Sequence, residues 1–545
     1  MDKEVEKDEK RFAASTNTLF ASQNGYYALN SQDTRQIYAD GIVSINKTFV
    51  NKYNVTANIG SSIEDVSYNQ YMYGGKLAGV ANLYTFANVN TSTAENSQSG
   101  YHKQKQSAFA SASFGYKNML FLDGTARNDW ASSLIALSSK SFFYPSVGLS
   151  GVLTDLLHIK SDKLPYLKIR GSYSEVGNEP VQFLNIPTYP LSGGYPVVGG
   201  STPLPNPTLK PELTKSWEIG LNASFFKGAL RLDGTIYSSR TYNQFFQPTL
   251  SSGVGAQSII VNAGRVDNKG LELGAKYDKK FGSVSWNTYV NYSLNVNTVV
   301  QLLPGFTDPT TNQLVALHLS QIDMSGTGSY KMVLTEGSSM GDIYVNTLRV
   351  DEHGAIYVDP GSKTVTAEAN KFVYAGNNNP KYTASWGNNI KWKGINLGFQ
   401  FNARVGGIVV SNTQAMMDAF GVSQASAEAR DNGGVLVNGY KVPAKEYYQI
   451  VGAGASGGIA SMYVYSATNV RLAEASLGYD IPVKKWLKWV KTANVSLVGR
   501  NLLFLYNKAP FDPELTANTQ TYYQGIDYFM APSQRSIGFS VKLNF

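Results

Sequence analysis

The sequence of 545 residues contains no cysteine. This absence excludes disulfide bonds, thiolate metal ligands and cysteine nucleophiles, although it assigns no compartment. Charged residues make up only 16% of the chain, and no run approaches the roughly 18 to 20 apolar residues that a membrane helix needs. Hydropathy alone would classify the chain as soluble, but that test is blind to strands in which polar and apolar residues alternate.

Catalytic and nucleic-acid-binding patterns are also missing. The net charge of +8 is modest, and the Lys and Arg residues are scattered, which gives little support to a nucleic-acid partner. No nucleophile elbow, P-loop or zincin motif occurs, and the four histidines share no metal-ligand spacing. They are His102, His158, His318 and His353. We therefore expect that this protein is not an enzyme.

One acidic segment is a candidate for a loop-bound Ca²⁺ ion. It contains Asp351, Glu352 and Asp359 within "VDEHGAIYVDPGSK". The segment lacks the regular spacing of oxygen ligands that calcium loops have, so a solvated loop hairpin is the favoured alternative. We otherwise expect no cofactor.

Tyrosine (35), phenylalanine (25) and glycine (51) are abundant, a composition that suits strands and turns and predicts an all-β fold. In the final segment "SIGFSVKLNF", Phe539, Val541, Leu543 and Phe545 alternate with polar residues. This pattern predicts a membrane β-strand with one face toward lipid. A half-buried strand of a soluble sandwich would show the same local pattern, so the rest of the chain must decide.

Strands of about 10 to 13 residues recur in pairs joined by tight turns, the length that tilted membrane strands require. Turns are predicted at Asn51 to Lys52, Lys117 to Asn118, Lys227 to Gly228, Phe281 to Gly282 and Lys393 to Gly394. The alternation is clearest over residues 382–405, where Trp386 and Trp392 share the apolar face and should contact lipid. In another segment, "VRLAEASLGY", the phase of the alternation slips near Ala473 to Ala475, which suggests a β-bulge or a wrong register.

The connections are strongly asymmetric, with short turns on one side and long polar loops on the other. The long loops include residues 65–103, 176–214, 297–380 and 406–468. Outer-membrane barrels have short periplasmic turns and long extracellular loops. We therefore predict an antiparallel transmembrane β-barrel portion of about 15 strands, with residues 36–545 in the barrel and residues 1–35 as a loop or connecting segment.

Several blocks resemble the SusC/RagA family of TonB-linked outer-membrane transporters. They are "LFLDGTARNDWASSL", "SFFYPSVGLSGVL", "YLKIRGSYSEVGNEP", "NPTLKPELTKSWEIGLNASFF", "VNAGRVDNKGLEL", "NVRLAEASLGYDIP" and "VSLVGRNLLFLY". The resemblance covers nearly the whole chain in the correct order. Ala473 and Glu474 stand where the family often has a Lys-Asn pair, and Pro211 and Glu212 replace an aromatic-containing turn.

The resemblance implies the carboxy-terminal portion of an importer in the outer membrane of a Gram-negative bacterium. Such a barrel has about 22 strands, and the plug and the signal peptide would precede this chain. The implied partners are a SusD-like surface lipoprotein, an energising TonB complex, an oligosaccharide or peptide substrate, and the lipid bilayer. A passive porin or adhesin barrel and a secreted all-β glycan-binding protein are the alternatives.

The candidate ligand or lid contacts lie in the last long loop. Aromatic faces pack on sugar rings, and carboxylates orient a glycan or a peptide through hydrogen bonds. The candidates are Tyr506, Phe511, Asp512, Tyr522, Tyr523 and Tyr528, accompanied by Glu514 and Phe529. An aromatic girdle at the lipid headgroups is the alternative for each aromatic residue. The end of the chain, with Phe539, Val541, Leu543 and Phe545, resembles the signal that directs barrel assembly.

Overall fold

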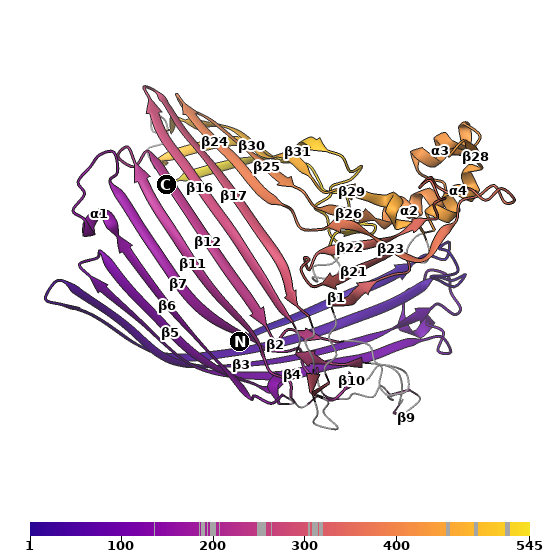
Figure 1. Cartoon of the computed structure of the whole chain (residues 1–545), viewed down its shortest axis with the longest axis horizontal. Coiled ribbons are helices and arrows are strands. Elements are labelled where there is room, and N and C mark those ends of the chain that lie inside the picture. Colours follow the sequence, from indigo (N-terminus) through magenta and orange to yellow (C-terminus); the bar gives the residue numbers. More distant parts are fainter. Residues whose placement is uncertain are drawn as a thin grey trace.

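A large antiparallel sheet of sixteen strands dominates the computed structural model, and its strands follow one another in chain order (Figure 1). The structure describes residues 1–135, 137–184, 186, 191–192, 195–196, 203–206, 208–247, 258–262, 264–302, 306–307, 314–315, 320–453, 458–483, 489–517 and 524–545. The sheet strands are β1 (Asp2–Phe12), β2 (Tyr26–Phe49), β3 (Tyr53–Lys76), β4 (Glu95–Tyr116), β5 (Leu120–Ala131), β6 (Ser141–Val152), β7 (Tyr166–Asn178), β11 (Glu212–Phe225), β12 (Leu230–Tyr242), β16 (Arg265–Phe281), β17 (Val284–Gln301), β24 (Tyr382–Trp392), β25 (Ile395–Val405), β30 (Asn469–Ile481), β31 (Thr492–Asn507) and β33 (Ser536–Asn544). The predicted all-β antiparallel fold is confirmed.

The long connections form a separate layer at one end of the sheet, which we call the loop cap. It contains two small sheets. One consists, in order, of β20 (Gln321–Gly326), β21 (Tyr330–Thr335), β22 (Asp342–Leu348) and β23 (Ala367–Asn377). The other consists of β29 (Val464–Ser466), β26 (Ile408–Ser411) and β32 (Ile526–Asp527). The cap also contains α2 (Asn412–Ala419), α3 (Gln424–Asp431), α4 (Ala444–Val451), η5 (Ala460–Tyr463) and the hairpin β27 (Val435–Val437) to β28 (Tyr440–Val442). Buried side chains such as Met332, Ile343 and Val410 join its two sheets.

Short elements complete the connections. They are η1 (Phe86–Asn88), η2 (Ser132–Leu134), α1 (Leu153–Leu156), β8 (Leu191–Ser192), β9 (Tyr195–Pro196), β10 (Pro203–Leu204), β13 (Phe245–Phe246), β14 (Ser258–Ile259), β15 (Val261–Asn262), β18 (Phe306–Thr307) and β19 (Leu314–Val315). Among the helices that the structure describes, none has both the length and the hydropathy of a membrane-spanning segment.

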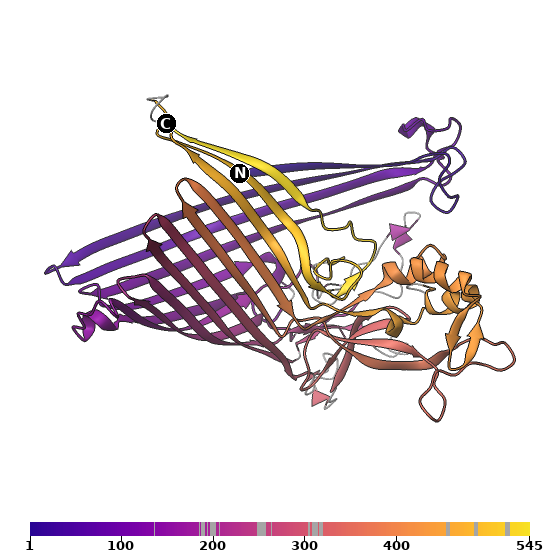
Figure 2. The ribbon, with the colours of Figure 1, turned by 90° about the horizontal axis from the view of Figure 1, so that it is seen from above.

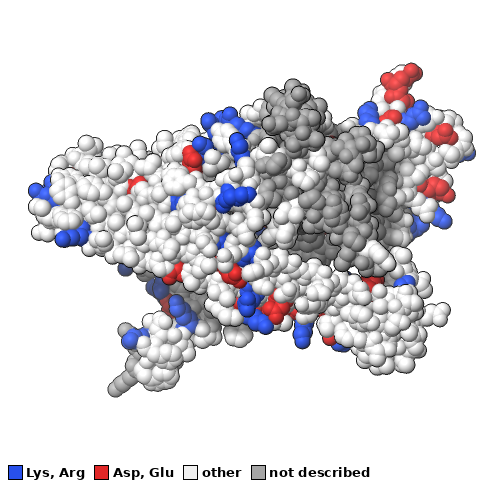
Figure 3. All heavy atoms as spheres, turned by 90° about the horizontal axis from the view of Figure 1, so that it is seen from below, with Lys and Arg blue, Asp and Glu red and all other residues white. Residues whose placement is uncertain are grey.

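The two faces of the large sheet differ in polarity, as the alternation predicts. On β2, Ile37, Val43 and Ile45 lie on one face, which we call the outer face, and all three are exposed. Beyond Ile37 the same face carries Arg35 and Asp33. From Ile37 to Phe49 a strand tilted by about 45° covers roughly 28 Å, close to the thickness of a bilayer core. Figure 3 shows a broad stretch of one side of the molecule with few charged side chains.

The segment predicted as a loop over residues 1–35 is instead largely strand, which corrects that expectation. β1 pairs with β2 from Asp2 opposite Gln36 to Phe12 opposite Tyr26. All these pairs lie beyond the apolar part of β2, so the charged side chains of β1 lie outside the stretch that we assign to the bilayer core. Figure 2 shows β1 to β4 extending along one side of the molecule and reaching the end at which the cap lies.

The predicted turns and the predicted bulge are confirmed. Lys117 and Asn118 both have positive φ values, 49° and 55°, as a two-residue hairpin of type I′ requires. In β30, Glu474 pairs with Gln400 and Leu472 pairs with Phe401, so that Ala473 is the extra residue. This bulge explains the slip in the alternation.

The sheet is open in the part of the chain that the structure describes. It ends at β1 on one side and at β33 on the other, and each of these strands has a single neighbour. In β33, Phe539 pairs with Leu497, Val541 with Val495 and Leu543 with Ala493. The ring of Phe545 stacks on Trp489 at 5.3 Å between centroids.

Candidate functional site

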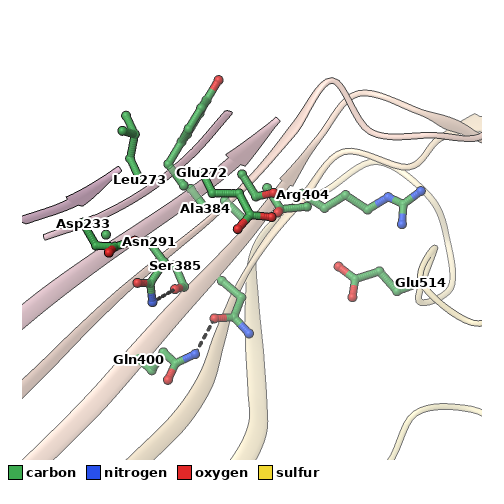
Figure 4. A pocket seen from close by; sticks show the side chains of 15 residues that line it. Asp233, Glu272, Leu273, Asn291, Ala384, Ser385, Gln400, Arg404 and Glu514 are labelled. Carbon is green, nitrogen blue, oxygen red and sulfur yellow. Dashed lines mark hydrogen bonds between the residues drawn. The ribbon is translucent and has the colours of Figure 1, made fainter. Parts of the chain in front are cut away.

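A hollow of about 640 Å³ lies on the inner, polar face of the large sheet, close to the loop cap. Its lining comes from five neighbouring strands and from one residue of the last loop, Glu514 (Figure 4). The lining residues are Asp233 on β12, Glu272, Leu273 and Gly274 on β16, Asn291, Tyr292 and Ser293 on β17, Thr383, Ala384 and Ser385 on β24, Gln400, Asn402, Ala403 and Arg404 on β25, and Glu514. Its volume falls within the range of small-molecule sites.

Hydrogen bonds between neighbouring strands hold the amide side chains of the hollow in place. The amide nitrogen of Asn291 donates to Ser385 Oγ at 3.2 Å. The amide nitrogen of Gln400 donates to Asn402 Oδ1 at 2.7 Å, and the hydroxyl of Tyr289 donates to Gln400 Oε1 at 2.9 Å. These bonds orient the side chains before any ligand arrives, which lowers the entropy cost of binding.

Most carboxylates at the hollow are already paired with protein cations. Asp233 accepts a hydrogen bond at 3.2 Å from Arg170, which lies on the inner face of β7. Glu514 accepts from Arg471 at 2.8 Å and from Asn469 at 3.0 Å. The charges of Asp233 and Glu514 are thus balanced within the protein.

A buried ion cluster fixes the base of the last loop to β30, and we call it the loop clamp. Arg471 donates to both carboxylate oxygens of Asp512, at 3.1 and 3.2 Å, and its guanidinium lies over the Phe504 ring at 5.0 Å. The Arg471 and Asp512 side chains are only 11% and 5% exposed. A two-pronged Arg–carboxylate pair is strong and has a defined geometry. The clamp therefore holds Glu514 at the edge of the hollow.

The structure separates the other predicted contact residues. Tyr506 pairs with Val470 on the outer face, opposite to the face that carries Arg471. Phe511 packs edge-on against Tyr465 at 5.5 Å. Tyr528 is exposed in the cap, where it touches only its neighbour Phe529 among the described rings. Tyr522 and Tyr523 lie outside the described residues.

Of the predicted residues, Asp512 serves the clamp and its companion Glu514 reaches the hollow. The polar residues that build the hollow were overlooked in the sequence. Their signal was present in residues 382–405, where Ser385, Gln400, Asn402 and Arg404 occupy the polar phase of the alternation. Nothing in the one-dimensional pattern distinguishes a hollow from the rest of a polar wall, because the curvature of the sheet decides which of these residues converge.

The acidic loop segment forms turns. Asp351 accepts hydrogen bonds from the backbone N–H groups of His353 and Ala355, both at 2.9 Å. Asp359 accepts from the N–H groups of Gly361 and Ser362, and the bonds with Ser362 lower the pKa of Asp359. The described residues contain no group of three or more His, Cys, Asp or Glu side chains placed to hold a metal ion.

Comparison with known proteins gives a match to the model of the family "TonB dependent receptor-like, beta-barrel" over residues 7–502. The chain belongs to this family. This confirms the TonB-linked transporter family recognised in the sequence and the expected place in the outer membrane. It also agrees with the expectation of no enzyme, because family members are receptors and transporters.

The curated relatives include two receptors from Formosa agariphila. TonB-dependent receptor P3 is 24% identical over 563 residues, covering 98% of this chain and 55% of the relative. TonB-dependent receptor P26 is 23% identical, covering 93% of this chain and 52% of the relative. The RagAB peptide importer in its open-open state matches the fold with a TM-score of 0.75 at 17% identity, covering 100% of this chain and 58% of that chain. The chain thus spans about half the length of the curated relatives it matches.

Proposed function

We propose that this chain is the barrel portion of a TonB-dependent importer that takes up oligosaccharides or peptides through the outer membrane. The observation that carries the proposal is the polar hollow on the inner wall, beneath a cap of long loops, in a chain of this family. Energy from the TonB complex would reach this barrel through a plug region, as in the resembled family. The RagAB peptide importer has a similar fold, which supports nutrient import.

The proposal includes a SusD-like lipoprotein that covers the loop cap. One part of the cap, around α2, α3 and the hairpin of β27 and β28, carries a group of four exposed large apolar side chains, and exposed apolar side chains on a loop surface favour a protein partner. They are Phe420, Val422, Leu436 and Tyr440, between 51% and 75% exposed. They lie around α2, α3 and the hairpin of β27 and β28, at the end of the molecule away from the short turns (Figure 1).

The test is affinity purification of the tagged protein from outer membranes of the source bacterium, followed by mass spectrometry. A surface lipoprotein should copurify with the unchanged protein and be lost with the double variant Phe420→Glu and Leu436→Glu. The matched control is Val50→Glu, since Val50 is 78% exposed in a short turn at the other end of the sheet. Recovery of the same lipoprotein with the double variant would contradict the role of the cap.

Uptake is tested separately with fluorescently labelled oligopeptides and oligosaccharides in cells with and without a functional TonB complex. Uptake of either class should require both this protein and TonB. Entry that continues without TonB would instead support a passive porin.

A further inference from the structure

Two charged side chains at the hollow, Glu272 and Arg404, form no ion pair with the residues that the structure describes, although Glu514 lies near enough to Arg404 to interact with its charge. The Glu272 carboxylate makes no hydrogen bond or ion pair to the residues that the structure describes, and its side chain is exposed at the hollow (Figure 4). Arg404 donates to the backbone oxygen of Asn378 at 2.6 Å but has no carboxylate within ion-pair distance in the described chain. The other two carboxylates of the lining, Asp233 and Glu514, are paired with Arg170 and Arg471.

The two unpaired charges belong to separate parts of the hollow. Glu272 lies on β16 and Arg404 on β25, with β17 and β24 between them in the sheet. In Figure 4 the Arg404 side chain extends away from Glu272, toward the loop that carries Glu514. A ligand that satisfies both groups must therefore be extended and must carry a positive and a negative charge at different positions.

The wall of the hollow offers a free acceptor and a free donor. Asn291 uses its amide nitrogen on Ser385, which leaves its oxygen for a ligand donor. Asn402 uses its oxygen on Gln400, which leaves its amide nitrogen for a ligand acceptor. A peptide backbone presents one N–H donor and one C=O acceptor per residue, so it matches this wall.

We propose that the hollow binds an extended oligopeptide with free ends, placing a cationic group at Glu272 and a carboxylate at Arg404. This inference rests on the proposed importer function and narrows its substrate class. A neutral oligosaccharide would cover both charges without pairing them, and leaving a charged group desolvated and unpaired lowers affinity. Charge-assisted hydrogen bonds to a zwitterionic peptide avoid that cost.

The test is calorimetric titration of the purified full chain in detergent with four probes. They are penta-alanine with free ends, N-acetyl penta-alanine, penta-alanine amide and maltopentaose. The free peptide should bind, and acetylation of its amino end should weaken binding about tenfold, the effect of losing one charge-assisted bond. Glu272→Gln should weaken binding of the free peptide by a similar factor and should abolish the difference between the free and the acetylated peptide.

Arg404→Gln should act in the same way on the carboxyl end, removing the difference between the free peptide and its amide. Glu218→Gln is the matched control, since Glu218 lies on the inner face of β11 and outside the lining of the hollow. It should leave all affinities unchanged. The modified peptides test the idea on the unchanged protein, so the result does not depend on whether a variant folds.

Three results would overturn the inference. They are equal binding of free and acetylated peptide, binding of maltopentaose as tight as that of the peptide, and no binding of any probe. Each leaves the importer proposal standing, because TonB-dependent uptake is measured in cells by a separate assay. Loss of that uptake dependence, with peptide selectivity intact, would instead refute the importer function alone.

Discussion

Removing the cation of the loop clamp should release the last loop from the barrel wall. In the variant Arg471→Met, the Asp512 carboxylate stays buried without a cation and Glu514 loses the cation it pairs with. Breaking a buried ion pair by removing one member costs about 3 to 5 kcal/mol. Because about 1.4 kcal/mol corresponds to a factor of ten, the open state of the loop should become roughly 10²- to 4 × 10³-fold more populated.

Hydrogen exchange measured by mass spectrometry over residues 508–517 reports this opening. The N–H of Glu514 donates to Asp512 Oδ1 at 3.0 Å, and the N–H of Leu515 donates to the backbone oxygen of Asp512 at 3.2 Å. Both should exchange faster by the same factor as the population of the open state. Adding Asp512→Asn to Arg471→Met should recover part of the protection, because the second change removes the uncompensated buried charge.

The control uses an ion pair of the same type on the surface. Arg500 lies 3.4 Å from Glu474, and their side chains are 68% and 55% exposed. Such exposed pairs contribute only about 0.2 to 1 kcal/mol, so Arg500→Met should change exchange by no more than about fivefold. If Arg471→Met changed exchange as little as Arg500→Met, the clamp would not hold the loop and the reasoning would be refuted.

Three further predictions concern the cap and the inner wall. The buried hydroxyl of Tyr463 donates to Asp418 at 3.0 Å, so Tyr463→Phe should destabilise the cap by about 1 to 3 kcal/mol in thermal unfolding. Burial raises the pKa of Tyr463 above the unfolded value of about 10, so the unchanged cap should lose stability as the pH rises above that value, and Tyr463→Phe should lose less. A Cβ atom at Gly387 would lie 2.2 Å from the ring of Tyr289, so Gly387→Ala should cost about 1 to 3 kcal/mol, whereas Gly538→Ala, with open space around it, should be neutral in the same assay.

The periodic features of the sheet were predictable from the sequence because they are local. Alternation of polar and apolar residues indicates the strand pairs, and residues that tolerate positive φ, such as Asn118 and Gly394, indicate the short turns. Even the bulge at Ala473 left a visible slip in the phase. The period of two is a property of the extended backbone itself, so it needs no knowledge of neighbouring strands.

β1 was missed because its sequence carries charges on both faces. Such a segment is a poor membrane strand by every local criterion. It forms a strand because the first half of β2, from Tyr26 to Gln36, lies beyond the apolar part of that strand. There the backbone N–H and C=O groups of β2 can pair with β1 in an aqueous setting. How far a strand continues beyond the membrane depends on how far its neighbours continue.

By itself, the sequence determined the all-β class, the phase of the regularly alternating strands, the hairpin turns and the family. Only the tertiary structure decided which polar residues meet. Arg471 and Asp512 are 41 positions apart, and Glu272 and Arg404 share a hollow across four strands. Alternation assigns Glu272, Arg404 and Arg471 to a polar face, whereas Asp512 lies in the last loop. The partners of all four depend on strand register, sheet curvature and the path of that loop, which arise from contacts between distant segments.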